Sequence, residues 1–153
     1  MKIGSEESLT PLAHSANNRC FGCGEANPVG LQLKFSQAAD GTIVSTPVLS
    51  DLYIGHPGIL HGGILATLLD EAMSKSVRAL GRTAVTAKME IDYLQPAPSG
   101  KALRIEGRVV RTEGRKHWTE ATVADAEGQI FAQGKGLFLD VKLQAKGPLT
   151  AKG

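Results

Sequence analysis

The sequence predicts an α+β fold in which an antiparallel sheet of five or six strands wraps around one long helix. Apolar residues recur every three to four positions over 61–80, the spacing of a helix, and the pattern stops at Gly81. Two short segments before this helix and four after it have the character of strands, and apolar and polar residues alternate most clearly over 31–35 and 85–93. An antiparallel sheet around the helix buries the apolar face of every element.

The predicted helix is apolar around more than half of its circumference. The positions that form this face are Ile64, Leu65, Leu68, Leu69, Ala72, Met73 and Val77. A helix that lies on a protein surface needs a narrower apolar stripe. We therefore expect the sheet to enclose the helix and not only to support one side of it.

Turn residues separate the predicted strands. Before the helix, residues 31–35 alternate in polarity, and Asp40-Gly41 leads into a second run over 42–48, which together indicate a hairpin. After the helix, the predicted strands cover 85–93, 103–111, 116–125 and 129–141.

The length of 153 residues suits a single domain, which we place at 19–142 between a flexible arm, 1–18, and a tail, 143–153.

The net charge of +2, from 17 basic and 15 acidic side chains, is too small to indicate nucleic acid or an anionic membrane as a partner. The longest strongly apolar stretch, 64–69, is far shorter than the ~20 residues that cross a bilayer. We expect a cytoplasmic protein.

Two glycines and a carboxylate indicate chemistry on the predicted helix. Gly62 and Gly63 open the helix, and without side chains they let another group approach the backbone closely. The unpaired N–H groups there and the helix dipole favour a developing negative charge, as in an oxyanion hole. Asp70, two turns further along, is then a candidate general base or nucleophile.

The neighbouring acid, Glu71, competes with Asp70 for this role, because the two lie on opposite borders of the apolar face and periodicity does not decide between them. Glu71 has Lys75 four residues later, in the favourable order for an ion pair on the helix surface. Asp70 has no cation at such a spacing. A carboxylate without a local partner on a mostly buried helix favours a chemical role for Asp70.

Three groups of residues resemble a known family. They are Cys20-Phe21-Gly22-Cys23-Gly24 with Asn27, Pro28, Gly30 and Leu31; His61-Gly62-Gly63 with Leu68-Leu69-Asp70-Glu71-Ala72; and Asp92-Tyr93-Leu94 before Pro96. As a set, over about residues 20 to 140, the chain resembles the hot-dog thioesterases, in particular the PaaI-like and 4-hydroxybenzoyl-CoA thioesterase branch.

The resemblance implies a hot-dog fold and hydrolysis of an acyl-CoA or acyl-carrier thioester without a cofactor. It implies that Asp70, nine positions after the histidine of the HGG motif, is the catalytic acid, and that Thr86 on the following strand assists it. Gly62 would supply the oxyanion-hole N–H, and His61 would position the helix start. The family's sites combine the helix start of one subunit with the acid of another, which implies a homodimer or homotetramer.

Thr86 does not fit the alternation of its own strand. It is out of phase with Val85, Ala87 and Met89, so that it faces away from the helix if those residues face it. A role for Thr86 therefore needs a partner subunit or a local bulge.

Further residues are candidates for contact with the substrate. We predict Gly63, His56, Glu71 and Arg82 in this group. The CoA phosphates would need basic partners, and besides Arg82 the available side chains are Arg78, Arg111, Arg115 and Lys116.

Cys20 and Cys23 have a spacing that suits a metal or redox site. Zinc usually takes four ligands, and the other candidates are Asp and Glu residues, His14, or histidines distant in sequence such as His56. Because nearby ligands are missing, we expect packed thiols in a structural turn and no metal.

Two other functions remain open. In a hot-dog hydroxyacyl-thioester dehydratase or hydratase, a loop histidine pairs with the helix acid, and His56 lies fourteen residues before Asp70. A non-catalytic acyl-CoA-binding domain would bind the thioester without turnover. The acyl group itself cannot be read from the sequence.

Overall fold

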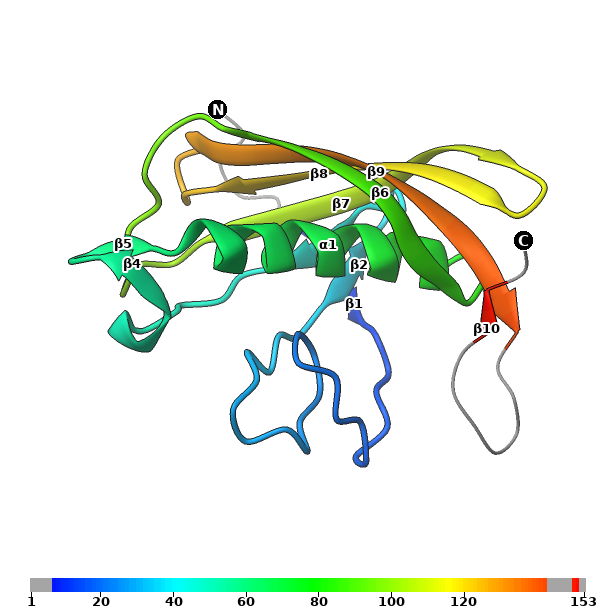
Figure 1. Cartoon of the computed structure of the whole chain (residues 1–153), viewed down its shortest axis with the longest axis horizontal. Coiled ribbons are helices and arrows are strands. Elements are labelled where there is room, and N and C mark those ends of the chain that lie inside the picture. The colour runs from blue at the N-terminus through cyan, green and yellow to red at the C-terminus, as the bar shows by residue number, and fades with distance from the viewer. Residues whose placement is uncertain (1–6, 143–149, 152–153) are drawn as a thin grey trace.

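A computed structural model describes residues 7–142 and 150–151, so the predicted tail, 143–153, lies almost entirely outside the described residues. One α-helix, α1 (Gly62–Arg78), packs against the inner face of a large antiparallel sheet (Figure 1). This confirms the predicted α+β architecture.

Helix α1 begins and ends where the sequence signals it. His61 is the N-cap residue, with an extended backbone (φ −62°, ψ 138°), and its Nδ1 accepts a hydrogen bond from the Gly63 N–H. After Arg78 the chain makes a turn, and Gly81 has a φ of +79°, which suits glycine.

No helix among the described residues is long and apolar enough to cross a membrane.

The sheet has eight strands: β1 (Leu9–Pro11), β2 (Ser36–Ala38), β3 (Ile43–Ser45), β6 (Ala84–Tyr93), β7 (Arg104–Glu113), β8 (Lys116–Ala124), β9 (Ile130–Lys142) and β10 (Thr150–Ala151). Its order is β1-β2-β3-β7-β8-β9, with β6 and β10 both paired to β9. The sheet exceeds the predicted five or six strands because β1, β2 and β10, each of two or three residues, extend it.

A second, two-stranded sheet lies just before the helix. It consists of β4 (Ile54–His56) and β5 (Ile59–Leu60), and a single 3₁₀ turn, Asp51–Tyr53, precedes it. The backbone N–H of His61 donates to the carbonyl of Tyr53, which connects this segment to the helix start.

The predicted hairpin is present but displaced. Leu31, Leu33 and Phe35 are buried and alternate with exposed residues as expected, yet residues 31–35 form no strand. The N–H groups of Leu31 and Leu33 donate to the carbonyls of Phe21 and Gly22 instead, and the hairpin is formed by β2 and β3. These hydrogen bonds hold the loop of residues 20–24 against the rest of the domain.

The helix and the sheet approach each other closely at Gly107 in β7. A Cβ on this residue would lie 2.5 Å from the carbonyl oxygen of Ala72 in α1, far inside van der Waals contact. Ala72 is itself fully buried. The absence of a side chain at position 107 therefore sets how tightly the sheet closes on the helix.

We expect Gly107→Ala to lower the free energy of unfolding by about 2 kcal/mol, because the helix backbone must move to admit the methyl group. Gly134→Ala is the matched control, since a Cβ there meets Leu69 at an ordinary 3.4 Å, and its cost should stay within about 1 kcal/mol. Urea unfolding of both variants measures the difference. Equal stability of the two variants would contradict the packing described.

Candidate active site

Asp70 is held by one side chain of the sheet. The Thr86 hydroxyl in β6 donates a hydrogen bond of 2.5 Å to Asp70 Oδ1. Asp70 is half-buried, and no ion pair links it to another described residue. One carboxylate oxygen is thus oriented by Thr86, and no cation neutralises the group.

A β-bulge brings Thr86 to this position. Thr86 pairs with Phe138 and Lys88 pairs with Leu137, the very next residue along β9, so Ala87 is an extra residue in β6. The bulge shifts the alternation by one, and Thr86 therefore shares a face with Met89 and Ile91, which pack against the core. This local bulge was one of the two conditions that the sequence set for a role of Thr86.

The helix start has its own set of contacts. His61 caps the Gly63 N–H at 2.9 Å, and the Tyr93 hydroxyl donates to the Gly62 carbonyl at 2.9 Å. The Gly62 N–H itself donates to no group in the part of the chain that the structure describes. His61 thus positions the helix start, as the sequence suggested. Its hydrogen bond engages the Gly63 N–H, whereas the Gly62 N–H can bind a ligand.

The free N–H and the carboxylate are too far apart to act together within one chain. Gly62 and Asp70 are eight residues apart on a regular helix, which places them about 12 Å apart along its axis. In a working site, the base contacts the attacking water and the oxyanion donor contacts the carbonyl oxygen of the same substrate group. The base and the donor must therefore lie at roughly half that separation. One chain therefore carries both components of such a site, but not in contact.

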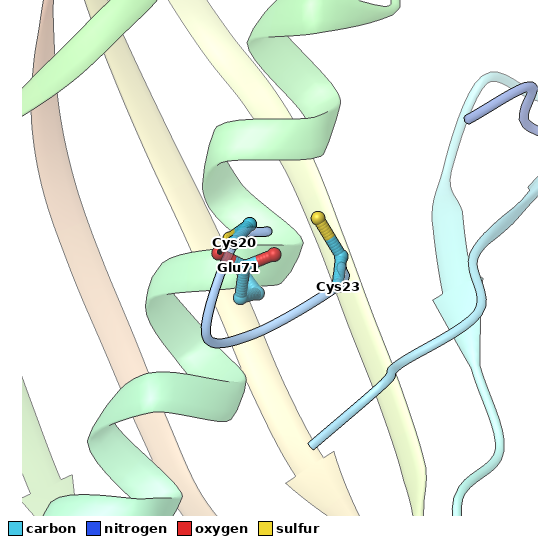
Figure 2. Close-up of side chains that lie close together, drawn as sticks. All are labelled: Cys20, Cys23 and Glu71. Carbon is cyan, nitrogen blue, oxygen red and sulfur yellow. Dashed lines mark hydrogen bonds between the residues drawn. The ribbon is translucent and has the colours of Figure 1, made fainter. Parts of the chain in front are cut away.

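Glu71 is not paired with Lys75, and the predicted surface ion pair is wrong. Lys75 is buried and its Nζ donates to Cys23 Sγ at 3.0 Å, while Glu71 turns towards the loop that carries the cysteines. Glu71 Oε1 accepts from Cys20 Sγ at 3.4 Å, and the buried Oε2 has no hydrogen-bond partner among the described residues (Figure 2). The ion-pair prediction fails because the helix rotation that buries Leu68 and Ala72 also buries Lys75.

The structure does not bring His56 to Asp70. His56 is exposed on β4, which lies beyond the N-terminal end of α1 (Figure 1), whereas Asp70 is two turns inside the helix. The histidine–acid pairing of a dehydratase is therefore not formed within one chain.

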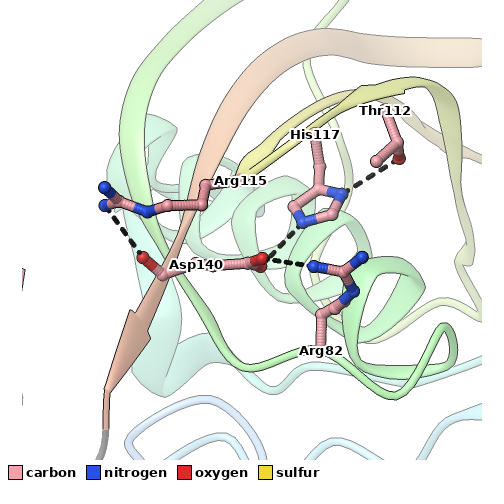
Figure 3. Close-up of polar contacts among 5 residues, drawn as sticks. All are labelled: Arg82, Thr112, Arg115, His117 and Asp140. Atoms are coloured by element: carbon pink, nitrogen blue, oxygen red, sulfur yellow. Dashed lines mark hydrogen bonds and ion pairs between the residues drawn. The ribbon is translucent and has the colours of Figure 1, made fainter. Parts of the chain in front are cut away.

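Arg82 lies between the C-terminal end of α1 and the start of β6, where it belongs to a polar network (Figure 3). Its Nη1 lies 2.7 Å from Asp140 Oδ2, and fully buried His117 donates from Nε2 to Asp140 Oδ1 at 2.7 Å. Burial raises the pKa of Asp140, but the hydrogen bonds from His117 and Arg82 outweigh it, so that the pKa lies below its ordinary value. Arg82 thus has a carboxylate partner in place of a phosphate.

Two of the other basic candidates, Arg111 and Arg115, also have protein contacts. Arg111 stacks 3.8 Å above the Trp118 ring and pairs with Glu113, and Arg115 donates to the Asp140 carbonyl. A phosphate would have to compete with these contacts.

Sequence reasoning missed two residues at this helix. One is Tyr93, whose hydroxyl donates to the Gly62 carbonyl, a contact between distant segments that no local pattern signals. Lys75 was assigned to the surface, and the one signal against this was its position within the broad apolar face of the helix.

The chain is similar to known thioesterases. The family model described as the thioesterase superfamily matches residues 57–132, which include α1 and the helix-start motif. The acyl-coenzyme A thioesterase THEM4 of Xenopus laevis is 30% identical over 86 residues, covering 56% of this chain and 39% of that protein. The chain thus spans about two fifths of the length of that relative.

Solved structures give the same result. An X-ray structure of a thioesterase-superfamily protein has a TM-score of 0.66 and 33% identity, covering 71% of this chain and 84% of that one. The crystal structure of the BH2602 protein from Bacillus halodurans with CoA has a TM-score of 0.66 and 29% identity, covering 74% and 77%. With its single helix against an antiparallel sheet and its matching helix-start motif, the chain belongs to the hot-dog thioesterase superfamily.

Proposed function

We propose that the protein hydrolyses an acyl-CoA thioester, with Asp70 as the carboxylate that activates water or attacks the thioester. The observation that carries this proposal is the Asp70–Thr86 pair. Asp70 is a half-buried carboxylate on the helix that bears the family's motif, it has no cation partner among the described residues, and the Thr86 hydroxyl of β6 orients it. Charged side chains in a protein interior are usually paired, and Asp70 has no ion pair among the described residues.

The reaction follows from these groups. Asp70 removes a proton from water as the water oxygen attacks the thioester carbonyl carbon, and the carbonyl oxygen becomes an oxyanion bound by the Gly62 N–H. When the carbon–sulfur bond breaks, the protonated Asp70 returns the proton to the leaving thiolate, giving a free acid and a thiol. The Thr86 hydroxyl occupies Asp70 Oδ1 and leaves Oδ2 for the water.

The proposed site lies between two copies of the chain. The distance of about 12 Å between Gly62 and Asp70 in one copy supports this, because a second helix in antiparallel orientation would bring its own Gly62 to the first copy's Asp70. A two-fold dimer makes two such sites. Pairing of these dimers into a tetramer would leave the sites unchanged.

CoA as the carrier is supported by two of the similar proteins, one named an acyl-coenzyme A thioesterase and one crystallised with CoA. A dehydratase or hydratase would pair a histidine with the acid, and within one chain the partner of Asp70 is Thr86 and not His56. A binding domain without activity is disfavoured by the unneutralised carboxylate. Thiol release from acyl-CoA distinguishes hydrolysis from both.

We expect Asp70→Asn to lower kcat at least ~100-fold while the fold survives, because the amide keeps the size and the Thr86 hydrogen bond but cannot act as a base. Asp92→Asn is the matched control, because Asp92 is an exposed aspartate on β6 that accepts a hydrogen bond from Gln133, and this variant should remain active. Thiol release from a panel of acyl-CoAs, with circular dichroism of each variant, provides the measurement. A fully active Asp70→Asn enzyme would refute the assignment.

We expect Gly62→Pro to lower kcat roughly 100-fold or more, because proline removes the one N–H that the oxyanion needs. Proline suits the first position of a helix, and the extended backbone of His61 suits the residue before proline, so that α1 should form normally. Gly62→Ala keeps the N–H, its Cβ meets only the Tyr93 ring at 3.5 Å, and it should retain most of the activity. Similar losses in the two variants would argue against an oxyanion role for this N–H.

A further inference from the structure

We propose that Cys20, Cys23 and Glu71 form a zinc site that joins the N-terminal loop to helix α1. The two sulfur atoms and a carboxylate oxygen of Glu71 all lie within 4.8 Å of one another (Figure 2). The sequence offered the two thiols and no third ligand near them. The fold supplies it from 51 residues away. This inference does not depend on the proposed enzymatic activity.

The spacing of the three groups is close to that of a tetrahedral zinc site. With zinc–sulfur bonds of about 2.3 Å and zinc–oxygen bonds of about 2.0 Å, ligand sulfur and oxygen atoms lie about 3.5 Å apart. Cys20 Sγ and Glu71 Oε1 are 3.4 Å apart. All three ligand atoms lie within 4.8 Å of one another, so rotations of the side chains can bring them to one ion, and a water molecule can complete the four ligands.

The loop is built to lie against Glu71. A Cβ on Gly22, between the cysteines, would lie 2.3 Å from the Glu71 side chain, and a Cβ on Gly24 would lie 2.5 Å from the backbone of Asn18 and Cys20. The Gly24 N–H donates to the Cys20 carbonyl at 2.9 Å and closes the turn. Both glycines are thus required to present the two thiols to the helix acid.

The surroundings of Cys23 suit a thiolate. This buried sulfur accepts hydrogen bonds from Lys75 Nζ at 3.0 Å and from Asn18 Nδ2 at 3.4 Å. Such N–H donors around a ligating sulfur stabilise its charge and fix its orientation. Glu71 Oε2, buried and without a hydrogen-bond partner in the described chain, is a polar atom that a metal ion or its bound water would satisfy.

The charges of the cluster balance with zinc bound. Two thiolates and one carboxylate carry three negative charges, and Zn²⁺ with the Lys75 ammonium carries three positive charges. The partly buried cluster is therefore neutral as a whole when zinc is bound. Two soft sulfur ligands favour zinc over magnesium or calcium.

The ion would have a structural role. Glu71 faces the N-terminal loop, whereas Asp70 faces β6 through Thr86, so the cluster and the candidate active site lie on different sides of α1. His14, one of the ligands that the sequence offered, lies outside this group of three and lines a separate cleft with Lys75 and Arg78. Zinc would thus fix residues 20–24 to α1 at Glu71, the residue that directly follows the candidate catalytic acid, Asp70.

The test is metal binding by the full chain, purified without a metal-binding tag or chelator. We expect one zinc per chain by elemental analysis. After chelator treatment and reduction, Co²⁺ should produce sulfur-to-cobalt charge-transfer absorption and the visible bands of a tetrahedral site. Zn²⁺ should then displace the cobalt and abolish these bands.

Variants locate the site. Cys20→Ser and Glu71→Gln should weaken zinc affinity roughly 100-fold or more, since each removes a direct ligand. Glu25→Gln, which changes an exposed acid in the same loop, is the matched control and should bind zinc like the parent protein. Thermal unfolding with and without zinc should show stabilisation in the parent and control proteins only.

The proposal is overturned if the reduced chain, with both thiols reactive, binds neither cobalt nor zinc. It is also overturned if Glu25→Gln weakens binding as much as Glu71→Gln does. If the variants fail to fold, the cobalt spectrum of the parent protein still decides, because Cys20 and Cys23 are the only cysteines of the chain and sulfur-to-cobalt absorption requires one of them.

Discussion

The packing of α1 against the inner face of the sheet is the interaction on which the other features depend. Eight residues of the helix are buried, and β7 comes so close at Gly107 that the helix cannot rotate or shift without a clash. Consecutive residues on a helix point about 100° apart. The fixed rotation therefore directs Asp70 towards β6 and its neighbour Glu71 towards the N-terminal loop, and gives these two acids different partners.

Local periodicity was enough to predict the helix and the four strands that follow it, because each buries a regular face of its own sequence. The strand predicted at 31–35 shows where this reasoning fails. Its side chains alternate in burial as predicted, but its N–H groups bond to Phe21 and Gly22, and alternation carries no information about the pairing partner. At Thr86, the mismatch in phase pointed to a bulge or a partner subunit, and the bulge is present.

The candidate site was predictable where it depends on positions along one helix, and less so where it depends on contacts between distant segments. Gly62 and Asp70 are separated by a fixed helical distance that the sequence already implies. The contact of Glu71 with Cys20 joins segments 51 residues apart, and the rule for helix-surface pairs instead assigned Glu71 to Lys75. That rule assumes two exposed side chains, and Lys75 is buried.

In the proposed enzyme, a complete active site needs the helix start of one copy and the acid of another. Its most direct test uses mixed dimers of Asp70→Asn and Gly62→Pro chains, co-produced with two different affinity tags and isolated through both. Each mixed dimer would hold one site with both components and one with neither, so about half of the wild-type activity per dimer should return although both parent variants are nearly inactive. Mixed dimers as inactive as their parents would show that both groups must belong to the same chain, and would contradict this account.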